Sequence, residues 1–184
     1  MKKIITLIIS VATITMFSNQ NLNAQTAMVK DKSVVSLGIG FGGYGNAYTT
    51  GATPTIMGKF EKGIIDDLGP GNLSVGGVIG IQKGDFDFVS SRTGYTYFTI
   101  GGRASYHPHF INSDKMDFYA GLGLGYYSVS AGTQTEFGSF GVTASSIAFN
   151  AHVGIRYDFN PQWGAWAELG SELSILSLGA SYNF

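Results

Sequence analysis

The sequence predicts an all-β protein, an eight-stranded antiparallel up-and-down transmembrane β-barrel. Segments of about ten residues alternate between apolar and polar side chains, which is the period of a strand and the length that crosses a bilayer at a tilt. Charged residues make up 12% of the chain and 27 residues are glycine. Soluble domains carry about 25% charged residues and about half as much glycine. Eight such segments, an even number, permit a closed antiparallel ring.

The clearest alternation lies near the end of the chain. One face of Ile175–Phe184 is wholly apolar and consists of Leu176, Leu178, Ala180, Tyr182 and Phe184. Residues 147–159 alternate as regularly. The other predicted strands are about Ser33–Tyr44, Pro54–Ile64, Leu73–Lys83, Tyr95–Tyr106, Met116–Ser128 and Trp163–Ser171. We expect loops at Gly84–Gly94 and, longest of all, at Val129–Ser145.

The first 24 residues are expected to be a signal peptide that is removed after Ala24. Lys2 and Lys3 precede an apolar run from Ile4 to Phe17. That run of about 14 residues is shorter than the ~20 residues of a spanning helix, and small residues suited to cleavage follow it. Residues 25–184 would then form one barrel domain.

The charged, glycine-rich face of each strand is expected to point into the barrel and the apolar face toward lipid. A soluble lipocalin-like barrel would reverse these faces. Arg103, Arg156 and Glu168 lie on the face that also carries most of the glycines. A crowded interior needs small residues, whereas a solvated exterior does not, so the membrane barrel is favoured.

Eight titratable side chains are predicted to converge in the interior: Lys59, Glu61, Arg103, Asp117, His152, Arg156, Asp158 and Glu168. Side chains fill an eight-stranded interior, and an unpaired charge buried there costs several kcal/mol. We therefore expect an ion-paired plug. Folding back over the turn at Asn160–Gln162 would place His152 roughly opposite Glu168. The alternative is a gated or proton-responsive conduit that uses His152.

We expect no catalytic, cofactor or metal site. His107 and His109 flank a proline in what reads as a solvated turn, which is a poor arrangement for a metal. Residues 38–43 match G-x-G-x-x-G, but a loop follows them where a dinucleotide site needs a helix. None of the three histidines is expected at the outer rim of the barrel, so no nucleophile–base pair with histidine as the base is expected there. The chain has no cysteine and a net charge of −1, so thiolate chemistry and nucleic-acid binding are not expected.

The long predicted loop is the candidate for contact with a surface partner. Val129–Ser145 is β-prone, partly apolar and weakly charged, and Phe137 and Phe140 are its candidate binding residues. Loops on a rigid barrel commonly carry binding. The segment could instead extend the hairpin.

A last strand that ends on Tyr182 and Phe184 resembles the assembly signal of Gram-negative outer-membrane barrels. With the signal peptide, the alternation and the length, the chain resembles the small eight-stranded OmpA/OmpX-type family of porin-like barrels. The resemblance implies a bacterial outer-membrane location and contacts with outer-membrane lipids and the barrel-assembly machinery. Members of that superfamily differ widely in activity. We expect a non-enzymatic structural or surface-interaction protein; the alternatives are an OmpW-like carrier of small solutes and a lipid-modifying enzyme.

Overall fold

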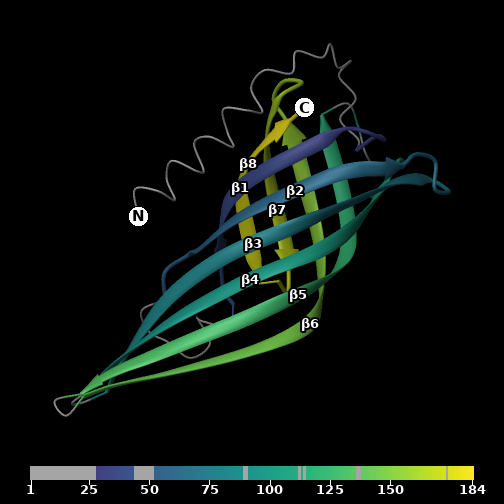
Figure 1. The fold of residues 1–184 in the computed structure, drawn as a ribbon. Helices are drawn as coiled ribbons and strands as arrows, with labels where there is room; N and C mark the ends of the chain where they lie inside the picture. Colours follow the sequence, from purple (N-terminus) through teal and green to yellow (C-terminus); the bar gives the residue numbers. More distant parts are fainter. Residues whose placement is uncertain are drawn as a thin grey trace.

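The computed structural model describes residues 28–43, 52–88, 91–111, 113, 115–135, 138–172 and 174–184. These residues form a closed barrel in which each strand pairs antiparallel with its sequence neighbours and the last strand returns to the first (Figure 1). The strands are β1 (Ser33–Phe41), β2 (Thr55–Ile65), β3 (Gly71–Phe88), β4 (Ser91–Pro108), β5 (Met116–Thr135), β6 (Gly138–Asp158), β7 (Trp163–Gly170) and β8 (Leu176–Asn183). The predicted fold class is confirmed. The predicted signal peptide lies outside the described residues.

The described residues contain no helix that is long and apolar enough to span a membrane.

The strands differ greatly in length. This corrects the loops predicted at Gly84–Gly94 and Val129–Ser145 and confirms the alternative that Val129–Ser145 extends the hairpin. β3, β4, β5 and β6 contain 18, 18, 20 and 21 residues, whereas β7 and β8 contain 8 each. Most of Gly84–Gly94 and Val129–Ser145 is therefore paired strand, because these Gly-, Ser- and Thr-rich segments continue the hairpin ladders. The four long strands extend beyond the rim on one side of the barrel (Figure 1). We call this part, within residues 83–98 and 127–146, the projecting sheet.

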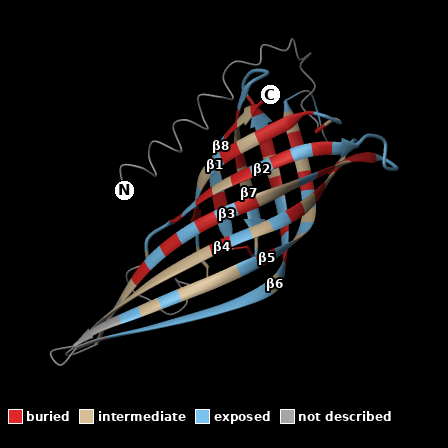
Figure 2. Cartoon of the chain, in the orientation of Figure 1, coloured by how far each residue is buried: buried red, intermediate tan, exposed pale blue. Residues whose placement is uncertain are grey.

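Burial follows the predicted alternation (Figure 2). Arg103, Arg156 and Glu168 are buried, while Leu122 and Phe149 on the opposite face are 68% and 86% exposed. Large apolar side chains are exposed on all eight strands, among them Leu37, Ile56, Ile79, Ile100, Leu124, Val153, Leu169 and Leu178. Such a continuous apolar exterior matches the lipid-facing band of a membrane barrel and excludes the reversed faces of a lipocalin-like barrel.

The two ends of the barrel wall meet at a fully paired seam. β1 pairs with β8 from Val34 to Phe41, and the amide of Ser33 donates to the carbonyl of Phe184 at 2.9 Å. Closure matters because hydrocarbon offers no partner to an open sheet edge. The ring of Tyr182 lies 5.0 Å from that of Trp163 and 6.3 Å from that of Phe184. The role of Tyr182 and Phe184 as an assembly signal stays a prediction.

Inward glycines make room for the large interior side chains. A Cβ on Gly121 would meet the backbone carbonyl oxygen of Ala104 and, at 2.5 Å, Nε2 of His152. A Cβ on Gly154 would meet the ring of Tyr119. By contrast, nothing lies within 4 Å of a Cβ placed on Gly132 in the projecting sheet. The glycine-rich inner face thus reflects crowding, as the sequence indicated.

We predict that Gly121→Ala lowers the free energy of unfolding by about 1–3 kcal/mol, because the added methyl group overpacks against backbone that cannot move aside. The control Gly132→Ala should stay within about 0.5 kcal/mol of the parent. Urea unfolding in lipid vesicles, followed by tryptophan fluorescence, measures both. Equal effects of the two changes would contradict the crowding argument.

Candidate functional site

Glu168 is the centre of one of two ion-paired clusters inside the barrel. Its Oε2 accepts hydrogen bonds from Nζ of Lys59 at 3.0 Å, from Nη2 of Arg103 at 2.6 Å and from the hydroxyl of Tyr119 at 3.0 Å. Nη1 of Arg103 also donates to Glu172 at 3.3 Å. These five residues, the Glu168 cluster, join β2, β4, β5, β7 and the β7–β8 turn.

Arg156 is the centre of the second cluster. Its Nη2 donates to Glu61 at 2.6 Å and its Nη1 donates to Asp117 at 3.1 Å. His107 lies against both carboxylates, with Nδ1 2.8 Å from Asp117 and Nε2 3.5 Å from Glu61. The hydroxyl of Ser74 donates to Glu61 at 2.6 Å. These five residues form the Arg156 cluster, which joins β2 to β6.

All eight predicted interior side chains are buried in the barrel. Six of them belong to the two clusters. Asp158, at the end of β6, lies 3.6 Å from Nζ of Lys32, which precedes β1. Glu168 pairs with Gly154, so His152, predicted roughly opposite Glu168, lies two positions farther along the same face of β6 and pairs with Gly170. Nε2 of His152 lies 3.0 Å from the hydroxyl of Ser105.

The prediction for His107 was wrong. We expected a solvated turn, but β4 continues to Pro108 and His107 is 0% exposed. The alternation that places Arg103 and Ser105 inside could have been continued by two residues to find it. His109 does lie at the turn, where its Nε2 is 2.8 Å from Asn72 Oδ1. Lys32 and Glu172 were missed for another reason. Lys32 precedes β1 and Glu172 follows β7, so strand periodicity does not apply to either residue.

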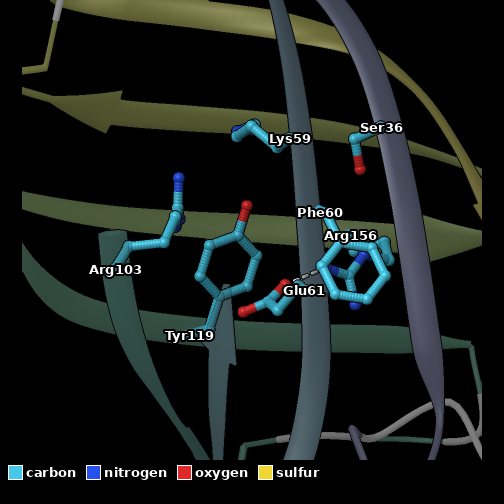
Figure 3. Close-up of a pocket in the computed structure, with 7 residues that line it drawn as sticks. All are labelled: Ser36, Lys59, Phe60, Glu61, Arg103, Tyr119 and Arg156. Carbon is cyan, nitrogen blue, oxygen red and sulfur yellow. Dashed lines mark hydrogen bonds and ion pairs between the residues drawn. The ribbon is translucent and has the colours of Figure 1, made fainter. Parts of the chain in front are cut away.

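A small cavity lies between the two clusters. Its volume is about 10 Å³ and it is lined by Ser36, Lys59, Phe60, Glu61, Arg103, Tyr119 and Arg156 (Figure 3). This volume suits about one water molecule. The hydroxyl of Tyr119 points between Lys59 and Arg103 in the same view (Figure 3). Among the described residues, no three His, Asp or Glu side chains are grouped as a metal site would require.

The projecting sheet is the other candidate site, and it contains one of the two predicted binding residues. Phe140 lies in β6 and is 75% exposed. Phe137 lies outside the described residues. β6 pairs with β5 along its whole length but with β7 only from His152 to Asp158. Within the described chain, the stretch Gly138–Asn150 therefore has a strand on one side and a free backbone edge on the other.

The two glutamates that share Arg103 are predicted to contribute unequally to stability. Glu168→Gln should lower the free energy of unfolding by about 3–5 kcal/mol, because Arg103 and Lys59 lose their common buried counter-charge. Glu172→Gln should leave the stability at pH 7 unchanged or slightly increased. Urea unfolding of both variants in the same vesicles makes the comparison. A loss of similar size in both variants would contradict the assignment of Glu168 as the centre.

The reason for the difference is the environment of Glu172, which lies in the β7–β8 turn outside the spanning strands. Burial raises the pKa of Glu172 above the ordinary 4.5, and Arg103 offsets this only in part. The folded protein therefore binds this proton more readily than the unfolded chain, and ionised Glu172 weakens the fold above its ordinary pKa. Any stability gained in Glu172→Gln should shrink as the pH falls toward 4.5.

Comparisons with known proteins agree on the fold. No protein-family model and no curated protein matches the chain. Ail of Yersinia pestis, in a crystal structure with the heparin analogue sucrose octasulfate, gives a TM-score of 0.55 at 17% identity over 85% of this chain and 100% of Ail. The N-terminal β-barrel domain of Pseudomonas aeruginosa OprF gives 0.51 at 14% identity over 84% of this chain and 98% of that domain. The chain thus has the fold of the small eight-stranded outer-membrane barrels of the OmpA/OmpX type.

Proposed function

We propose that this protein is a bacterial outer-membrane barrel whose lumen is closed and whose projecting sheet makes contacts at the cell surface. The observation that carries the proposal is the contrast between the two parts of the wall. The spanning part encloses two clusters of ion-paired side chains, and the cavity between these clusters has room for about one water molecule. The long strands β3–β6 extend beyond it on the side opposite the C-terminus (Figure 1). Export with removal of residues 1–24, and assembly guided by Tyr182 and Phe184, belong to the same proposal.

The carrier alternative has little support from the lumen. A carrier of apolar solutes needs an apolar interior and a path through it. Here Lys59, Arg103, Arg156 and Glu168 occupy the interior in short ion pairs. Moving them aside would separate buried charges at a cost of several kcal/mol. No observation favours the lipid-modifying enzyme.

The ligand bound to Ail is a polyanionic sugar, and such a ligand requires clustered cationic side chains. The sequence of the two projecting hairpins contains two basic residues, Lys83 and Arg92, and three acidic ones, Asp85, Asp87 and Glu136. This balance does not favour a sulfated glycan. We therefore infer a surface contact that does not depend on positive charge.

The closed lumen predicts negligible conductance. The refolded protein in a planar bilayer should give no steady single-channel currents, because the paired side chains fill the cross-section. A large-pore porin inserted in the same bilayers serves as the positive control. Stable, voltage-independent openings of the parent protein would overturn the closed-lumen half of the proposal.

The surface role is tested by shortening the β5–β6 hairpin. Ser130 and Thr143 are directly paired, so an Asn-Gly turn can replace residues 131–142 without changing the register. We expect the trimmed barrel to insert normally but cells that carry it to lose adhesion to other cells and to coated surfaces. Heat-modifiable gel mobility checks folding. Unchanged adhesion of cells with a correctly folded trimmed barrel would overturn the surface role.

A further inference from the structure

Residues 28–32, which we call the strap, lie before β1 at the end of the barrel opposite the projecting sheet. The amide of Asp31 donates to the carbonyl of Gly63 at 3.0 Å, near the end of β2. The amide of Lys30 donates to Oδ1 of Asp66 at 2.7 Å, in the turn that follows β2. Lys30 and Gly63 also form an isolated parallel bridge. The strap is therefore held by hydrogen bonds to the wall.

The first residue of the strap is held by a side chain that joins three segments. Met28 is fully buried, and its carbonyl accepts a hydrogen bond from Nδ2 of Asn72 at 2.8 Å. Oδ1 of Asn72 accepts from the amide of Asp67 at 3.1 Å and lies 2.8 Å from Nε2 of His109. Asn72 thus connects the strap to the β2–β3 turn and to the β4–β5 turn.

The strand ends beneath the strap are shielded from water. His107 is one residue from the end of β4, Asn72 is one residue from the start of β3, and the two are cross-strand partners. They are 0% and 3% exposed. Lys32, at the other end of the strap, is buried with its Nζ 3.6 Å from Asp158. Side chains at the rim of an open barrel would contact water, so their burial here requires a cover, and the strap lies at the same rim.

The Arg156 cluster beneath the strap contains a second cation. The hydroxyl of Ser74 gives its one hydrogen to Glu61 at 2.6 Å, and Nε2 of His107 lies 2.9 Å from the same hydroxyl oxygen. Nε2 must therefore donate. Nδ1 lies 2.8 Å from a carboxylate oxygen of Asp117, which can only accept. A histidine that donates from both nitrogens is positively charged, so His107 and Arg156 together balance the carboxylates of Glu61 and Asp117.

Resting on the closed lumen proposed above, we propose that the strap closes this end of the barrel and keeps water away from the Arg156 cluster. The four charges of that cluster attract one another strongly only in a site of low dielectric constant. Entering water would offer competing hydrogen bonds and weaken this attraction. In the orientation proposed above, this end of the barrel faces the periplasm. The strap is thus a lid that the chain itself supplies.

The wall offers a matched pair of substitutions that separates the strap from the rest of β2. A Cβ on Gly63 would meet the backbone carbonyl oxygen of Val29 in the strap, so Gly63→Ala should displace the strap. A Cβ on Gly58 of the same strand would meet only side-chain atoms of Ile79 and Leu37, each at 3.6 Å, which is ordinary contact. Gly58→Ala is therefore the control for the same chemical change.

The test measures how fast a water-soluble methanethiosulfonate reagent reaches a thiol inside the barrel. The chain has no cysteine, so a single introduced thiol can be followed by mass spectrometry. Ser181 and Ser177 are both buried on the inner face of β8. Ser181 lies beside Asp158, because a Cβ on Gly164 would meet an oxygen of each. Ser177 lies farther from the strap, where it pairs with Glu168.

The whole barrel in lipid nanodiscs carries either Ser181→Cys or Ser177→Cys. Adding Gly63→Ala should raise the labelling rate of Ser181→Cys at least about tenfold, because the opened end is populated more often. Met28→Ser removes the buried side chain of the strap without changing the wall, and it should act in the same direction. Gly58→Ala should change the rate by less than about threefold. Heat-modifiable gel mobility checks that each variant is folded.

Two results would overturn the strap as the closing element. One is an unchanged rate for Ser181→Cys in a folded barrel that carries either strap change. The other is an equal acceleration of Ser177→Cys, which would indicate that the whole barrel has loosened. Conductance of the parent protein reports separately on the closed lumen. An unchanged rate together with an absence of current would reject the strap and leave the closed lumen standing.

Discussion

The requirement that every charge inside the barrel has a partner governs the rest of this structure. Glu168 accepts hydrogen bonds from Lys59, Arg103 and Tyr119, so one carboxylate links strands from around the ring. Arg156 carries the opposite charge and also links strands, because it donates hydrogen bonds to both Glu61 and Asp117. In a low-dielectric interior, removing one member leaves its partners buried and uncompensated. The clusters therefore link the strands across the lumen, in addition to the backbone pairing between β1 and β8.

Pairing also explains the composition of the wall. Large interior side chains fit where the neighbouring strand presents a glycine beside them. Gly121 and Gly154 stand beside His152 and Tyr119 for this reason. The glycine content and the interior charges are thus two consequences of the same crowding. The apolar outer face completes the pattern, because a wall in hydrocarbon exposes carbon and hides its polar groups.

Because ion-paired side chains occupy the interior, the proposed surface role falls to the part of the wall that extends beyond the rim. There, Phe140 and Val142 of β6 are 75% and 70% exposed. On β5 and β6 the outer face changes from apolar to polar between the pair Tyr126 and Ile147 and the next outward pair, Ser128 and Ser145. The change from lipid to open solvent accounts for this.

The sequence alone determined the strand count, the closed antiparallel architecture and the faces of the wall. The alternation of apolar and polar residues shows which side chains face lipid and which face the interior, and it can be read for each strand separately. The same rule placed Arg103, Arg156 and Glu168 inside. It would have placed His107 inside as well, had the strand been continued to the proline.

Only the tertiary structure decided where the long strands end, which interior charges meet and what the β7–β8 turn does. Val129–Ser145 is β-prone, but its pairing in a hairpin depends on a partner strand that local sequence does not specify. His152 and Glu168 share the inner face, but the register of the β6–β7 hairpin pairs His152 with Gly170 and Glu168 with Gly154. Glu172 reaches Arg103 from a turn, where no periodicity applies. Periodicity carries information about faces, whereas contacts across the lumen depend on register and on closure of the whole ring.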